Sequence, residues 1–219
     1  MEWYKESAIK AYLETVKLCK LDHERRCCSF WNPGLQNSEL TAALAAGTNS
    51  QLIIEICSSM TCTTIALAAA SRQTGGRFVC ILSRPDSLPE SLKRMEAVDL
   101  LGGVEFLVGE AKDLISRFSN IDFALVDCSN DKFVGLFKML NFNPKGAILS
   151  TNNLLNKGSY ERGGCIWQTQ RIGDSLQVTR IKRGCVMSRQ IKKRWIVQID
   201  SQTGEEHVFL IRRNRSETR

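Results

Sequence analysis

The sequence lacks several features that would place it in a specialised class of protein. Its 219 residues include nine cysteines but only two histidines, and they contain no C-x-x-C pair, so the usual spacing of zinc ligands is missing. No apolar run approaches the roughly 20 residues that cross a membrane. The first residues mix both charges, unlike a secretory signal. We therefore expect no metal, no membrane span and an intracellular protein, cytoplasmic or nuclear, with free buried thiols.

A linker between domains is also missing. The four prolines are scattered, and no Gly/Ser-rich or like-charged run divides the chain. A hydrophobic content of 43% is enough to fill one sizeable core. We predict a single domain over residues 1–219, with N-terminal helices in 1–50, a nucleotide-binding core in 51–153 and basic strands in 154–219.

Positive charge is concentrated near the C-terminus. Residues 180–219 hold 11 Lys and Arg against 4 Asp and Glu, so this segment carries the whole net charge of +7. A basic stretch beside an aromatic such as Trp195 can bind RNA or DNA through phosphates and stacking. It can equally be a solvated face, or bind acidic partners or anionic lipid. Nucleic-acid binding through residues 180–195 is therefore one open hypothesis.

Short apolar runs alternate with helical patterns through the middle of the chain. Apolar stripes predict helices over residues 3–19 and from about 38 to a terminating Gly47. Strands are predicted near residues 51–56, 77–82, 104–108, 121–126 and 147–149, most of them followed by a helix. This order predicts an α/β fold with a parallel sheet covered on both faces and ligands at the carboxyl ends of the strands.

Three further strands are predicted after the parallel set. Residues 177–181, 195–199 and 208–211 have strand-like patterns, and a turn containing Gly204 separates the last two. Such a turn is typical of a β-hairpin. We therefore expect the sheet to be finished by an antiparallel C-terminal hairpin.

Four segments at the predicted strand ends resemble the successive motifs of class I S-adenosylmethionine-dependent methyltransferases. They cover residues 55–61, 104–111, 121–127 and 144–149. The enzyme pattern that they most resemble is that of the caffeoyl-CoA O-methyltransferases. The whole chain resembles a plant family of uncharacterised proteins grouped with that superfamily. The resemblance implies the Rossmann-like class I methyltransferase fold, with S-adenosyl-L-methionine as the candidate cofactor and an unknown small-molecule or protein acceptor.

The resemblance also implies a cofactor site, from which this sequence departs at several positions. An acidic residue ends the first strand in the enzymes, as Glu55 does here, but Cys57 and Thr61 replace the two glycines that follow it. A β-branched residue held at positive φ would cost about 1–3 kcal/mol. No acid ends the second strand to hold a ribose. The implied cofactor-binding residues are Glu55, Cys57, Ser58, Ser59, Asp86, Gly109, Glu110, Ala111 and Asp127.

Ordinary structural roles compete with these assignments. Ser58 or Ser59 would cap the helix after the first strand, and Asp86 would cap the next helix. Glu110 would be a first-turn acid that the helix dipole favours.

The metal site of the caffeoyl-CoA type is incomplete here. Asp127 and Asn152 match its pattern, but Thr151 replaces the second carboxylate, and this agrees with the expectation of no metal. No catalytic residue is assigned, since neither histidine falls in the motifs.

Three hypotheses remain for function. The first is a methyltransferase-like protein that binds S-adenosylmethionine with weak or no methyl transfer. The second is a non-catalytic pseudoenzyme, a binding or scaffold module on the same fold. The third is a nucleic-acid-associated protein that uses the basic C-terminal segment.

Overall fold

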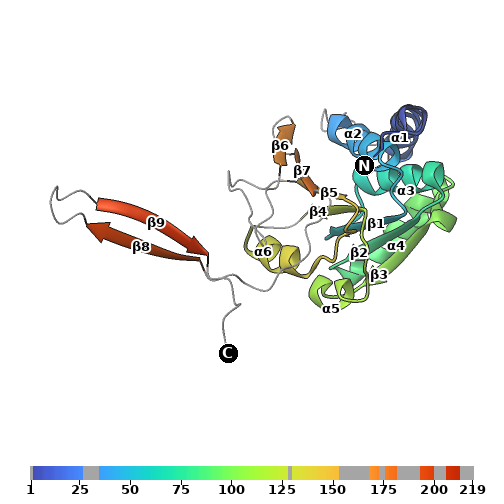
Figure 1. Ribbon diagram of the computed structural model, residues 1–219. Helices are drawn as coiled ribbons and strands as arrows, with labels where there is room; N and C mark the ends of the chain where they lie inside the picture. The colour runs from blue at the N-terminus through green and yellow to red at the C-terminus, as the bar shows by residue number, and fades with distance from the viewer. Residues whose placement is uncertain are drawn as a thin grey trace.

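A seven-stranded sheet forms the centre of the molecule (Figure 1). The computed structural model describes residues 2–26, 35–127, 130–152, 168–172, 176–181, 193–199 and 206–212. The strands, in the order β3-β2-β1-β4-β5-β7-β6, are β1 Leu52–Cys57, β2 Arg77–Leu82, β3 Val104–Val108, β4 Phe123–Asp127, β5 Ala147–Asn152, β6 Gln168–Ile172 and β7 Leu176–Ile181. Strands β1 to β5 pair in parallel, and β7 runs antiparallel to both β5 and β6.

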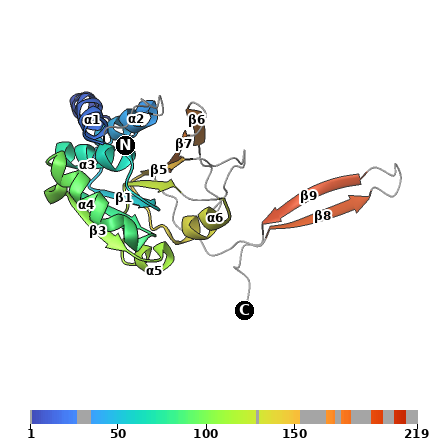
Figure 2. The same cartoon turned by 180° about the vertical axis from the view of Figure 1, so that it is seen from behind.

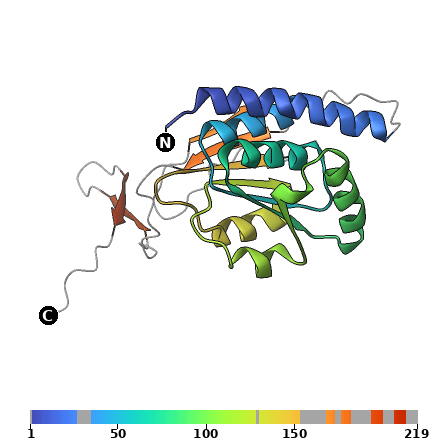
Figure 3. The ribbon, with the colours of Figure 1, turned by 90° about the vertical axis from the view of Figure 1, so that its right-hand side faces the viewer.

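Helices cover both faces of the sheet. They are α1 Lys5–Arg25, α2 Leu35–Gly47, α3 Cys62–Thr74, α4 Leu88–Ala97, α5 Ala111–Ile115 and α6 Asn130–Met139, with 3-10 turns at Pro85–Ser87 and Leu101–Gly103. Side chains of α1 to α4 pack with one face of the sheet, and those of α5 and α6 pack with the other. Figure 3 shows α1 lying across α2 and α3. This layered arrangement confirms the predicted α/β fold.

Local sequence explains the elements that flank the carboxyl ends of the strands. Five of the six residues of β1 are buried, as expected for a strand covered on both faces. Helix α3 is alanine-rich and buried over most of its length, which allows it to lie close to the sheet. Gly75 ends α3 in the left-handed conformation, with φ +67°, which glycine adopts without steric cost.

The N-terminal helices differ from their predicted bounds. Helix α1 extends to Arg25 rather than ending at residue 19, because Asp22 continues its buried stripe. Gly47 is the last residue of α2, but it is not among the glycines at positive φ. A side chain at Gly47 would instead collide with the ring of Trp3. Cys27 and Cys28 lie outside the described residues.

The predicted C-terminal hairpin is confirmed in the strands β8 Lys193–Ile199 and β9 Glu206–Arg212. It forms a two-stranded sheet of its own, and the antiparallel strands that finish the main sheet are β7 and β6 (Figure 2). The strand β6 was not predicted, since Gln168–Ile172 is mostly polar.

No helix within the described residues is long and apolar enough to cross a membrane.

Candidate functional site

The candidate site lies where the strand order reverses. The chain passes from β1 to β2 and β3 on one side, and then β4 pairs with the other edge of β1. Ligands of open α/β sheets bind at such a switch point, beyond the carboxyl ends of the strands. Ser58 and Ser59 follow β1, Asp86 follows β2, and Glu110 follows β3. The sequence therefore located these loops correctly.

Hydrogen bonds hold the first three loops side by side. The Ser83 N–H donates to the Cys57 carbonyl at 3.0 Å, and the Gly109 N–H donates to the Leu82 carbonyl at 3.0 Å. The Ser87 hydroxyl, which donates to the Arg84 carbonyl at 2.6 Å, also lies 3.2 Å from the Ser58 carbonyl. The side chains of Ser58 and Ser59 remain exposed. The loops thus form a fixed rim with free hydroxyls on it.

The turn after β1 is built without a glycine. Thr61 is the N-cap of α3, with φ −129°, so the strain that positive φ would bring does not arise. Its Oγ1 accepts from the Thr63 N–H at 3.2 Å, and Thr64 Oγ1 accepts from the Thr61 N–H at 3.2 Å. This reciprocal pair is a capping box. The prediction that Ser58 or Ser59 caps this helix was wrong, because the N-cap of α3 is Thr61, two residues after Ser59.

Glu55 points away from this rim, into the layer between the sheet and α3. Its side chain is fully buried, and one oxygen accepts from the Thr63 hydroxyl at 2.7 Å. The other oxygen, Oε2, has no hydrogen-bond partner among the described residues. Burial raises the pKa of the Glu55 carboxyl to about 7. Cys57 is buried on the same face, and its sulfur lies 3.8 Å from that of Cys80.

Asp86 is occupied by an ion pair. Its carboxylate accepts from Arg84 Nη2 at 2.6 Å and from Arg84 Nε at 3.3 Å, and both side chains are exposed. The Arg84 guanidinium lowers the pKa of the Asp86 carboxyl. Asp86 lies in the 3-10 turn before α4, and the α4 N-cap is Ser87. The predicted capping role of Asp86 was therefore wrong.

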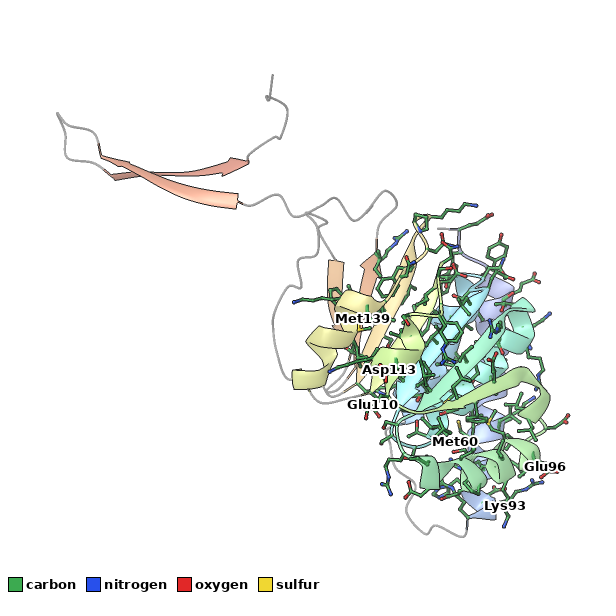
Figure 4. The ribbon with its side chains drawn as sticks, turned by 90° about the horizontal axis from the view of Figure 1, so that it is seen from below. Met60, Lys93, Glu96, Glu110, Asp113 and Met139 are labelled. Carbon is green, nitrogen blue, oxygen red and sulfur yellow. The ribbon has the colours of Figure 1, made fainter. Side chains whose placement is uncertain are left out.

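The loop after β3 turns at a glycine of positive φ. Gly109 has φ +146°, a conformation that other residues rarely adopt. Glu110 is the exposed N-cap of α5, with no side-chain capping bond, and Ala111 is buried behind it. Figure 4 labels Glu110 together with Met60 of the loop after β1.

Strands β4 and β5 end in a pair of polar residues. Asp127 and Asn152 are register partners, both partly buried. The Asn152 Oδ1 atom is buried and has no hydrogen-bond partner among the described residues. Thr151, where the enzyme pattern has a second carboxylate, is buried at 3% exposure. The carboxyl ends of β4 and β5 therefore carry one carboxylate and one amide.

Sequence reasoning missed a buried ion pair that supports the first loop. Arg94 on α4 donates to both oxygens of Asp22 on α1, at 2.9 and 2.8 Å, and to the Met60 carbonyl at 2.8 Å. The signal was present in α1, where Asp22 continues the stripe of Ala8, Ala11, Thr15 and Cys19. A charged residue in a buried stripe requires a partner.

The basic segment is described only in part. Arg180 is exposed on β7, and Lys193 and Arg194 open β8, but residues 182–192 lie outside the described part. Nucleic-acid binding through residues 180–195 stays a prediction.

A family model described as a protein of unknown function, DUF1442, matches residues 1–211. The chain belongs to this family. Among curated proteins, none matches it.

Solved methyltransferases share the fold of this DUF1442 member. The O-methyltransferase TomG from Streptomyces achromogenes, in complex with SAM, has a TM-score of 0.57 at 16% identity, over 78% of this chain and 90% of its own. The SAH-bound methyltransferase PaMTH1 from Podospora anserina has a TM-score of 0.59 at 15% identity, over 77% and 88%. A candidate caffeoyl-CoA O-methyltransferase from Staphylococcus aureus has a TM-score of 0.52 at 14% identity, over 77% and 99%. These likenesses confirm the Rossmann-like methyltransferase fold.

Proposed function

We propose that this DUF1442 protein binds S-adenosylmethionine or S-adenosylhomocysteine at the carboxyl ends of β1 to β4, with weak or no methyl transfer. The observation that carries the proposal is the hydrogen-bonded rim of three successive loops at the switch point. The SAM complex of TomG and the SAH-bound PaMTH1 support it, since they share the fold.

The residues of the rim suggest how the ligand would be held. The hydroxyls of Ser58 and Ser59 would bind its amino-acid end, and the loop of Gly109 and Glu110 would hold the adenine. Asp127, whose side chain is partly exposed, would face the ligand from the end of β4. S-adenosylmethionine supplies an electrophilic methyl group, and the protein would contribute mainly by aligning it with an acceptor.

Three side chains argue for weak or absent transfer. Glu55 and Cys57 are buried beneath the rim, and Asp86 is held by Arg84. Fewer groups would therefore contact the ligand than in the pattern that the motifs resemble.

A plant source and a cytoplasmic or nuclear location stay predictions that the resemblance and the thiol content imply.

Calorimetric titration of the full chain with each of the two ligands tests the proposal. Binding should be detectable at millimolar ligand and should be lost in Ser59→Trp, because the indole would fill the exposed rim. Ser119→Trp is the matched control, since Ser119 is an exposed serine that precedes β4, at the amino ends of the strands. Absence of heat in the wild-type protein would overturn cofactor binding and leave the pseudoenzyme hypothesis. A turnover assay with isotopically labelled methyl then separates weak transfer from none.

A further inference from the structure

Three potential metal ligands gather beneath the rim. Glu55 and Cys57 are two residues apart on β1 and so project to the same face of the sheet. Cys80 on β2 is the register partner of Glu55. One ligand atom from each of the three residues lies within 4.8 Å of the others, and this is the one such cluster found within the described residues. All three side chains are buried, with exposures of 0, 3 and 0%.

The spacing of the two sulfurs fits a shared zinc ion. A Zn–S bond of about 2.3 Å and a tetrahedral angle place two thiolate ligands roughly 3.8 Å apart. The Cys57 and Cys80 sulfurs are 3.8 Å apart. Two thiolates and a carboxylate are ligands that zinc accepts, whereas magnesium and calcium prefer oxygen alone.

The carboxylate supplies an independent indication. Glu55 is fully buried, and no hydrogen bond of good geometry reaches its Oε2 within the described residues, although the Thr64 hydroxyl and the Cys80 thiol lie close enough to the carboxyl to lower its pKa. A buried carboxylate oxygen without a partner is costly, and a bound cation would remove that cost. The other oxygen accepts from the Thr63 hydroxyl at 2.7 Å. Outer hydrogen bonds of this kind commonly orient metal ligands.

Charge balance also fits the surroundings. Two thiolates, one carboxylate and Zn²⁺ together carry a charge of −1. The ligands lie next to the first turn of α3, because Thr63 contacts Glu55 directly. The N-terminus of a helix stabilises negative charge.

We propose that Glu55, Cys57 and Cys80 bind one zinc ion beneath the candidate cofactor loop, with a water molecule as the fourth ligand. Binding would release the two thiol protons. The ion would cross-link β1 to β2 and hold Cys57, the last residue before Ser58 and Ser59, in place. The two cysteine ligands do not form a C-x-x-C motif, because they lie on different strands, β1 and β2. The proposal departs from the expectation of no metal, and it does not depend on the proposed function.

Metal analysis of the full chain, purified without a metal-binding tag, tests the proposal. After refolding with Zn²⁺ and removal of the excess, the wild-type protein should hold about one zinc per chain, and Cys80→Ala should hold at least about tenfold less. Cys62→Ala is the matched control. Cys62 belongs to the other described thiol pair, in which Cys19 Sγ donates to the Cys62 carbonyl at 3.7 Å, and this pair is not part of the ligand cluster. Cys62→Ala should bind like the wild type.

A second variant and a spectrum guard against misfolding. Glu55→Gln keeps the side-chain volume and should also reduce zinc binding. The wild-type protein loaded with Co²⁺ should show the strong visible absorption of tetrahedral thiolate coordination. Wild-type zinc below about a tenth of an ion per chain, a cobalt spectrum without thiolate bands, or Cys80→Ala that binds as much zinc as Cys62→Ala would each overturn the proposal. No adenosyl ligand is present in any arm, so the result is separate from the calorimetry.

Discussion

Two carboxylates at opposite ends of the sheet, Asp122 and Glu55, differ in how their oxygens are used. Asp122, before β4, accepts from the N–H groups of Gln51 and Leu52 at 2.9 and 3.0 Å and from Asn143 Nδ2 at 2.7 Å. Glu55, near the end of β1, has one oxygen without a partner among the described residues. The carboxylate at the amino end of the sheet thus has hydrogen-bond donors for both oxygens, whereas the carboxylate at the carboxyl end lacks a donor for one oxygen.

The same contrast extends along the carboxyl end. Ser150 Oγ and Asn152 Oδ1 on β5 are also buried without a partner among the described residues. Glu55 is among the last three residues of β1, and Ser150 and Asn152 are among the last three of β5. Only β4 lies between these two strands. Glu39 Oε2 on α2 is a fourth such atom among the described residues, and a buried polar atom of this kind requires a water molecule, an ion or another polar group as its partner. At the amino end of the sheet, the hydrogen bonds of Asp122 serve to hold the fold together.

The buried pair Asp22–Arg94 supports the carboxyl end from outside the sheet. Arg94→Ala should lower the free energy of unfolding by about 3 kcal/mol, because it removes two hydrogen bonds from the buried Asp22 carboxylate and leaves it only the half-exposed Arg26, whose Nη2 lies 3.2 Å away. The side chains are 3 and 11% exposed. Urea unfolding measures the loss.

Two controls separate this effect from loss of any ion pair. Glu105→Gln breaks an exposed pair with Arg77 and should cost less than about 1 kcal/mol. The double change Asp22→Leu with Arg94→Met should cost less than Arg94→Ala alone, since no buried charge is left. A loss in Arg94→Ala no larger than that in Glu105→Gln would contradict the role assigned to the pair.

The amino end should depend on Asp122. Asp122→Ala removes the acceptor of two backbone N–H groups and one amide, and should lower the free energy of unfolding by about 2 kcal/mol. Asp113→Ala, an exposed acid on α5, should have little effect in the same urea titration. Equal effects of the two changes would remove the distinction between the ends of the sheet.

The sequence could predict the fold and the loops, because both follow from local periodicity. Apolar runs and their bounds predicted where β1, β3 and β4 end, whereas the roles of Glu55, Glu110 and Asp127 came from the resemblance to methyltransferases. Contacts between strands could not be predicted in this way, because the register of two strands is not encoded locally. Nothing in the sequence around Cys57 or Cys80 indicates that the two residues lie side by side. Likewise, Asp22 looks like a polar stop to the first helix until Arg94, 72 residues away, is seen to pair with it.

The threonine cap of α3 tests the glycine-free turn. Thr61→Ala should lower the free energy of unfolding by about 1 kcal/mol, because it removes the acceptor for the Thr63 N–H. Thr61→Gly restores the residue of the enzyme pattern and should cost only about a few tenths of a kcal/mol, since glycine is tolerated at N-caps. Thermal and urea unfolding measure both. The assigned capping role fails if Ala and Gly are equally neutral.

The smallest expected effect concerns the exposed pair at the rim. The Arg84 guanidinium holds the pKa of the Asp86 carboxyl below its ordinary value, so Arg84→Gln should raise that pKa. NMR titration of the carboxyl carbon follows it, and Arg77→Gln, at a separate ion pair, should leave it unchanged. A lowered folded-state pKa stabilises the protein above the unfolded pKa, and the stabilisation is lost as the pH falls through the folded value. Both side chains are exposed, so unfolding should hardly change while the Asp86 titration moves. An unchanged Asp86 titration would show that Arg84 does not occupy this carboxylate in solution, and Asp86 would then be free to meet a ribose.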